Sequence, residues 1–78
     1  MNAIVQERIS ASPDRCGGRP CIRETRVRVK DILDMLAGGA DRADILESYP
    51  YIEDADISAA LAYGAALSDH VAIMPPAA

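Results

Sequence analysis

The stretch VKDILDMLAGGADRADILESYPYIEDADISAALAYGAAL, residues 29–67, decides the fold. Its apolar residues recur three and four positions apart, which is the spacing of an amphipathic helix. Gly38-Gly39 and Tyr49-Pro50 interrupt that spacing, and both are sequences at which helices end. The stretch therefore predicts three helices, at about residues 29–37, 42–48 and 54–68.

Polar residues at the expected helix starts support these bounds. Asp41 is a good cap for the second helix, and Asp44, three residues later, completes a capping-box pattern. Glu53 or Asp54 is the expected cap of the third helix. The residues expected on the inward face of that helix are Ile57, Ala60, Leu61 and Gly64.

Upstream of these helices the periodicity changes to two. Over residues 25–30, Thr and Val side chains alternate with cationic ones, as in a short strand with one apolar and one basic side. Cys21-Ile22 is a candidate for the other arm of a hairpin, with Arg23-Glu24-Thr25 as its turn. Residues 4–9 are a further candidate for an edge strand. We therefore expect a short β-strand or hairpin region within residues 3–29.

The size and composition of the chain favour one small domain. A chain of 78 residues buries only about 60% of its unfolded surface, so its core is thin. Half of its residues are hydrophobic, but many are Ala and neither Trp nor Phe occurs. We expect a single, mainly α domain over residues 1–78 that forms a homodimer.

The last residues, 69–78, are expected to form a flexible tail because their prolines cannot continue a helix. The alternative is a short apolar peptide that docks in the groove of a partner. The residues that would dock are Leu67, Val71, Ile73 and Met74.

Membrane and metal binding find no support in the sequence. No stretch approaches the roughly 20 apolar residues of a membrane-spanning helix, and MNAIVQERIS resembles no secretory signal, so we expect a cytoplasmic protein. Cys16 and Cys21 are expected to be reduced thiols. With His70 as the only histidine, they supply half of a tetrahedral zinc site, so no metal or other cofactor is expected.

The net charge of −4 hides a strong asymmetry. Residues 15–30 hold six cations against one acid, whereas residues 31–78 hold nine acids against Arg42 alone. Cations at every second position of a strand lie about 7 Å apart, close to the phosphate spacing along a DNA strand. The alternative is that they pair with the acidic helices of the same chain. The candidate contact residues for DNA or a partner protein are Arg19, Arg23, Arg26, Arg28, Lys30 and Ser58.

The third expected helix is poorly suited to contact DNA bases. Residues 54–68 contain no Lys or Arg and begin with acids that repel phosphates, which leaves Ser58 a minor role. Catalysis also finds little support, because no serine has a nearby histidine to activate it. The acid pairs are better explained as caps and solvated helix faces. We therefore predict no catalytic residues and no enzymatic function.

Three segments, read in order, resemble the family catalogued as domain of unknown function 433. They are GRPCIRETR at residues 18–26, ILESYP at residues 45–50 and DISAALAY at residues 56–63. The family patterns are Gly-Lys/Arg-Pro-x-Ile-x-Gly-Thr-Arg, Ile-Leu-x-x-Tyr-Pro and Asp-Ile-x-x-Ala-Leu-x-Tyr. The resemblance extends from about Ile9 to Ala66. It implies a homeodomain-like, three-helix helix-turn-helix core with a small N-terminal strand region.

The resemblance also implies an antitoxin of the VapB type, which neutralises a PIN-like ribonuclease toxin by binding it. A PIN-type active site is a cluster of acids that holds Mg²⁺, so an arginine from the basic segment can block it electrostatically. Binding of operator DNA for autoregulation is part of this hypothesis. The competing hypothesis is a protein-interaction module that never binds DNA. Glu24 departs from the family pattern, which has Gly there, and is strained if the turn requires a positive φ.

Overall fold

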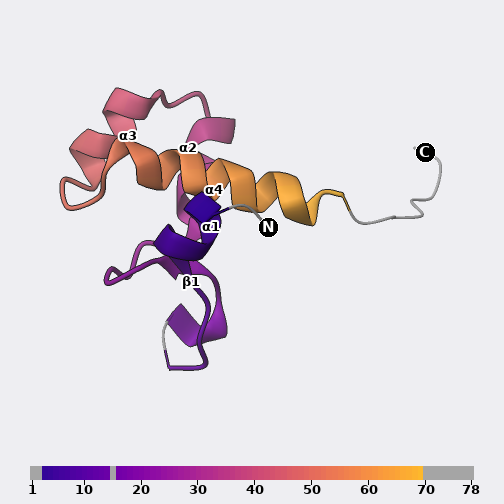
Figure 1. Ribbon diagram of the computed structural model, residues 1–78. Helices are drawn as coiled ribbons and strands as arrows, with labels where there is room; N and C mark the ends of the chain where they lie inside the picture. The colour runs from indigo at the N-terminus through magenta and orange to yellow at the C-terminus, as the bar shows by residue number, and fades with distance from the viewer. Residues whose placement is uncertain (1–2, 15, 70–78) are drawn as a thin grey trace.

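The structure, a computed structural model, describes residues 3–14 and 16–69. Arg15, His70 and nearly all of the expected tail lie outside the described residues. The described part is mainly helical, with one two-stranded antiparallel sheet of order β1-β2. In chain order the elements are α1 (Ala3–Arg8), β1 (Ile9–Ser10), the 3₁₀ turn η1 (Cys16–Gly18), β2 (Cys21–Ile22), α2 (Val29–Ala37), α3 (Arg42–Ser48) and α4 (Asp54–Leu67) (Figure 1).

The helices α2, α3 and α4 begin and end within one residue of the ranges expected from the apolar spacing. At the start of α3, Asp41 Oδ1 accepts a hydrogen bond from the Asp44 N–H at 2.9 Å, and Asp44 Oδ2 accepts one from the Asp41 N–H at 3.0 Å. The predicted capping box is therefore confirmed. After α2, Gly39 adopts a φ of 99°, which glycine reaches without strain. The narrower prediction, a homeodomain-like helix-turn-helix core, stays a prediction.

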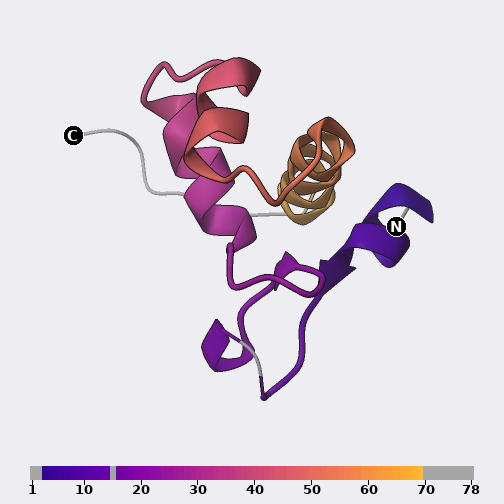
Figure 2. The same cartoon turned by 90° about the vertical axis from the view of Figure 1, so that its left-hand side faces the viewer.

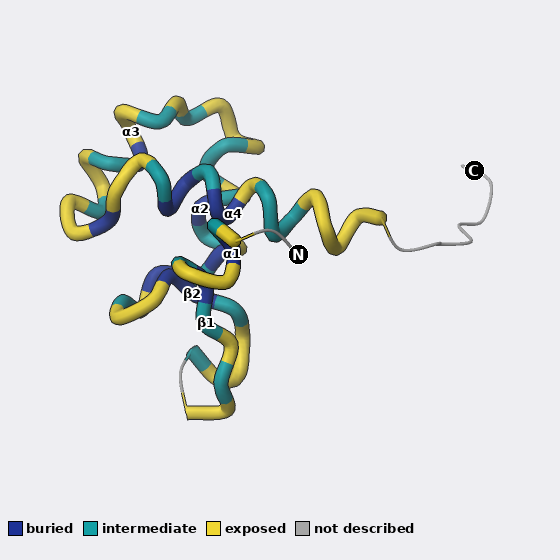
Figure 3. The backbone as a smooth tube through the Cα atoms, in the orientation of Figure 1, coloured by how far each residue is buried: buried dark blue, intermediate teal, exposed yellow. Residues whose placement is uncertain are grey.

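The core is built around α4. This helix lies between α1 on one side and α2 with α3 on the other (Figure 2). Buried positions gather where α4 meets these elements, whereas its C-terminal half is largely exposed (Figure 3). The buried hydrophobic residues from α4 and the elements around it are Val5, Ile9, Ile22, Val27, Val29, Ile32, Ile45, Ile52, Ile57, Ala59 and Ala60.

The inward face of α4 differs in part from the expectation. Ile57 and Ala60 are fully buried as predicted, but Leu61 is 41% exposed and that prediction was wrong. Ala59 is buried instead, because α1 and α2 cover two sides of the first half of the helix. Gly64 does face inward: a Cβ at this position would lie 3.2 Å from Leu33 Cδ1, so Gly64 allows α2 a close approach.

The expected edge strand at residues 4–9 is wrong, because residues 3–8 form α1. Val5 is the buried residue of this helix, and Ile9, the next buried residue, is the first residue of β1. Only at Ile9 does the backbone become extended. There β1 pairs with β2, with Ile9 opposite Ile22 and Ser10 opposite Cys21.

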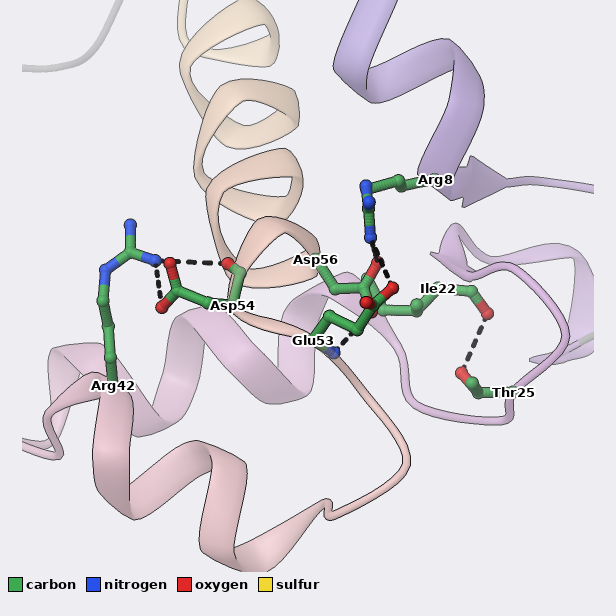
Figure 4. Close-up of polar contacts among 7 residues, drawn as sticks. All are labelled: Arg8, Ile22, Thr25, Arg42, Glu53, Asp54 and Asp56. Carbon is green, nitrogen blue, oxygen red and sulfur yellow. Dashed lines mark hydrogen bonds and ion pairs between the residues drawn. The ribbon is translucent and has the colours of Figure 1, made fainter.

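The hairpin predicted after residue 20 is present but is shorter than expected. The Ile22 N–H donates to the Val27 carbonyl at 2.9 Å, and Cys21 forms an antiparallel bridge with Arg28. The hydroxyl of Thr25 donates to the Ile22 carbonyl at 2.8 Å (Figure 4), and its oxygen accepts from the Val27 N–H at 3.1 Å. These bonds close the expected turn. Inside it Glu24 has a φ of 61°, so the condition under which strain was expected at this position is met.

None of the described helices is both long enough and apolar enough to cross a membrane.

Replacing Ile57 with Ala is expected to lower the free energy of unfolding by about 3 kcal/mol, because Ile57 is fully buried and truncation leaves a cavity. The matched control is Leu61→Ala on the same helix, which removes a partly exposed side chain and costs under about 1 kcal/mol. Urea unfolding followed by circular dichroism measures both. Equal losses from the two substitutions would contradict the burial pattern of α4.

Glu24→Gly is expected to stabilise the fold. A left-handed conformation destabilises a non-glycine residue by roughly 1–2 kcal/mol relative to glycine. Part of the gain from glycine is offset because glycine loses more backbone entropy on folding. We expect a net gain of about 1 kcal/mol, or a rise in Tm of about 4–8 °C. Arg23→Gly, at a neighbouring residue without a positive φ, is the control and should lower Tm. A lower Tm for Glu24→Gly would show that this turn does not require glycine-like backbone geometry.

Candidate partner-binding surface

The cations expected to form one row along a strand do not do so. Arg28 takes part only in the single bridge to Cys21, and Lys30 already belongs to the first turn of α2. Where the helix begins, the rise per residue falls from about 3.3 Å to about 1.5 Å, so a 7 Å spacing of charges is not kept. The prediction of a basic strand was therefore wrong, although Val27 and Val29 are buried as the alternation required.

Arg28 and Lys30 pair with acids of α2. Arg28 Nη2 lies 3.2 Å from Asp31 Oδ1, and Lys30 Nζ forms an ion pair with Asp34 one helical turn away. Both pairs are open to solvent, so each contributes only about 0.3–0.5 kcal/mol. For these two cations, the alternative of pairing within the chain is confirmed.

Arg19, Arg23 and Arg26 are exposed in the segment between η1 and α2. Arg23 Nη2 donates to the Gln6 carbonyl at 2.6 Å, which ties this segment to α1. Within residues 3–14 and 16–69, the guanidinium groups of Arg19 and Arg26 have neither an ion pair nor a hydrogen bond. They are the two cations of the described chain that an external acid can bind without displacing an internal partner.

Ser58 forms no hydrogen bond with this segment among the described contacts. Its hydroxyl oxygen, half-buried on α4, accepts a hydrogen bond from Arg42 Nη2 at 3.0 Å. Arg42 Nη1 also lies 2.9 Å from Asp54 Oδ1 (Figure 4), so Arg42 connects α3 to the start of α4. Ser58 therefore serves the contact between these two helices, and its bonding partner is Arg42 rather than any of the predicted arginines.

The most buried ion pair was not foreseen from the sequence. Arg8 Nη1 lies 3.0 Å from Asp56 Oδ1 and 3.1 Å from Glu53 Oε1 (Figure 4). Asp56 is only 7% exposed, and its Oδ2 accepts the Glu53 N–H at 2.8 Å, which caps α4. The hydrogen bonds that Arg8 donates, first to Asp56 and then to Glu53, raise the pKa of its guanidinium above the ordinary value. The sequence marks Asp56 as a capping acid, but nothing in it points to Arg8.

The predicted cations are divided between two concave surfaces. A polar hollow of about 950 Å³ is lined by Arg23 and Arg26 together with Arg8 and several acids. A second, smaller concavity of about 320 Å³ lies between α2 and the C-terminal half of α4, and we call it the α2–α4 groove. Its lining includes apolar side chains, among them Leu33, Tyr63 and Leu67, together with the cations Arg19, Arg28 and Lys30 and the acid Asp34.

Cys16 is half-buried and Cys21 is buried. Among the residues that the structure describes, no three His, Cys, Asp or Glu side chains gather where they would hold a metal ion. The described donor groups therefore define no metal centre.

Comparison with known proteins identifies the family. The profile of the family described as "Protein of unknown function (DUF433)" matches residues 9–64, which is more than half of the chain. The chain therefore belongs to the DUF433 family.

Two relatives extend this result. The chain is 36% identical over 64 residues to "Uncharacterized protein y4eO" of Sinorhizobium fredii (strain NBRC 101917 / NGR234), covering 82% of this chain and 29% of that protein. A crystal structure of a DUF433 member from Anabaena variabilis ATCC 29413, at 2.00 Å resolution, is similar with a TM-score of 0.76 and 32% identity. That similarity covers 85% of this chain and 65% of the Anabaena chain. The chain thus spans under a third of the first relative and about two thirds of the second.

Asp56→Ala is expected to lower the free energy of unfolding by about 2 kcal/mol, because it removes both the cap of α4 and the buried partner of Arg8. Asp54→Ala, which breaks an exposed ion pair on the same helix turn, should cost under about 1 kcal/mol. Adding Arg8→Gln to Asp56→Ala should cause little further loss, since the pair is already broken. Additive losses in urea unfolding would show that the two residues act independently.

Proposed function

We propose that this chain is the antitoxin of a toxin–antitoxin pair and that it neutralises a PIN-like ribonuclease by binding it directly, without catalysis of its own. The observation that carries the proposal is the exposure of Arg19 and Arg26 without an internal acid among the described residues. The other described cations are engaged by acids or by a carbonyl oxygen of the chain.

The chemistry of the proposed target suits these two arginines. A PIN-type active site is a cluster of carboxylates that holds Mg²⁺, and a guanidinium group binds carboxylates through two parallel N–H donors. Arg19 and Arg26 lose no internal ion pair when they contact such a cluster. Arg28 and Lys30 would first have to release Asp31 and Asp34.

The proposal takes α2, α3 and α4 as a homeodomain-like core, with α3 and α4 as the helix-turn-helix motif of a homodimer. In such a motif the N-terminal residues of the second helix contact base edges in the major groove. Here that end of α4 carries the exposed acids Glu53 and Asp54, which repel phosphates. This charge favours a protein over DNA as the principal partner.

Operator DNA is the second candidate partner, and a specific observation favours it. Arg19, Arg23 and Arg26 are all exposed on the segment that precedes α2. Contacts to phosphates would then come from this segment and not from α4.

The double variant Arg19→Gln/Arg26→Gln is expected to bind a PIN-like ribonuclease about 100-fold more weakly than the wild type does. Each arginine supplies charge-assisted hydrogen bonds worth roughly 1.5–3 kcal/mol. The matched control is Arg42→Gln, which removes an arginine engaged within the chain and should leave the affinity unchanged. Isothermal titration calorimetry measures all three proteins.

Unchanged affinity of the double variant would contradict the proposal. Titration of the upstream DNA at several salt concentrations tests the second candidate in parallel. If these arginines contact phosphates, the slope of log affinity against log salt should become shallower by about 0.9 for each arginine removed.

A further inference from the structure

We propose that the α2–α4 groove binds a short amphipathic segment of a partner protein, one whose large aliphatic side chains are flanked by carboxylates. This inference rests on the proposed function in that the partner is the toxin. It adds the place of binding and the chemistry of the segment that is bound.

The groove offers an apolar surface that the fold leaves open to water. Leu67, the last residue of α4, is 48% exposed, and Leu33 and Tyr63 beside it are only half-buried. They line one concavity beside the C-terminal half of α4. That half of the helix is largely exposed (Figure 3). Apolar residues gathered in a concave site mark a place where a partner side chain is buried.

The shape of the groove depends on Gly64. Because this residue has no side chain, Leu33 lies against the backbone of α4, where a Cβ would be 3.2 Å from Leu33 Cδ1. Leu33 thereby forms a contact with α4 while part of its side chain still lines the groove. At about 320 Å³, the groove is at the lower limit of small-molecule pockets, roughly 300–1,000 Å³, and suits a few side chains of a peptide.

The charged residues that line the groove determine the charge of the segment that can bind there. Arg19, Arg28 and Lys30 line the groove together with a single acid, Asp34. Arg19 has no internal acid among the described residues, and the pairs of Arg28 and Lys30 are weak because they are solvated. Carboxylates on a partner can therefore bind these cations, whereas a basic segment would be repelled.

Two other occupants fit the groove less well. Nucleic acid phosphates would use the cations but gain nothing from Leu33 and Leu67. A second copy of this chain, paired groove to groove about a two-fold axis, would bring Arg19, Arg28 and Lys30 against their own equivalents. An apolar segment with flanking acids uses both parts of the lining.

The first experiment uses a defined probe and the full chain. The probe is a fluorescent, stapled helical peptide of about three turns, with leucines at i and i+4 between glutamates, and its twin carries lysines in place of the glutamates. We expect the wild-type chain to bind the glutamate peptide at least about tenfold more tightly than the lysine peptide. Leu67→Glu should weaken binding of the glutamate peptide by about tenfold or more.

The matched control is Leu61→Glu. Leu61 is a comparably exposed leucine of the same helix, 41% against 48%, but it does not line the groove. This variant should bind like the wild type, and the exposure of both leucines lets both variants fold, which circular dichroism checks. Equal binding of the two peptides, or equal effects of the two substitutions, would overturn the inference. So would a wild-type dimer that Leu67→Glu alone dissociates, since the groove would then belong to a second copy.

The second experiment separates this inference from the proposed function, with a PIN-like ribonuclease as the probe. A loss of about tenfold or more in affinity for Leu67→Glu, but not for Leu61→Glu, supports both. If the wild type and Leu67→Glu bind that protein equally, the groove inference is overturned and the proposed function stands. If the wild type does not bind it but still discriminates between the peptides, the proposed function fails and the groove inference stands.

Discussion

The ion pair between Arg8 and the buried Asp56 is the constraint on which the arrangement of the molecule depends. A carboxylate that is 7% exposed must be paired, and Asp56 is paired by Arg8 and by the Glu53 N–H that it caps. The same contact holds the end of α1 against the start of α4. From there the Arg8 carbonyl accepts the Arg23 N–H at 2.8 Å, so the hairpin and its arginines are positioned by this junction.

Most of the described cations are thus paired with acids of the same chain. Acids of α2 and α4 neutralise the cations that they meet, and what is left for a partner is a pair of exposed arginines and one apolar groove. Arg19 lines the α2–α4 groove, whereas Arg26 lines the polar hollow. A partner that contacts both has to cover the segment between η1 and α2, and a continuous basic ribbon for DNA is not available there.

Local physics explains which features the sequence could predict. Apolar spacing, capping acids and glycine stops act within a few residues, so α2, α3 and α4 were predicted closely. The glycine that the family pattern has at Glu24 raised the question of a positive φ, which the structure shows there. The ion pair of Arg8 with Asp56 joins residues 48 apart and leaves no local pattern. The exposure of Leu61 likewise depends on how far α1 and α2 cover α4. Arg28 and Lys30 pair with acids three and four residues further along α2, and contact of the predicted cations with a partner stays a prediction.

The most direct test of partner binding through the exposed arginines and the α2–α4 groove is hydrogen exchange of this chain, alone and with a PIN-like ribonuclease. If the partner binds at the exposed arginines and the α2–α4 groove, amide exchange should slow on binding over residues 19–33 and over residues 63–67, the two segments that form these surfaces. Slower exchange confined to α3 and the N-terminal half of α4, with no change over residues 19–33 and 63–67, would contradict binding at these surfaces.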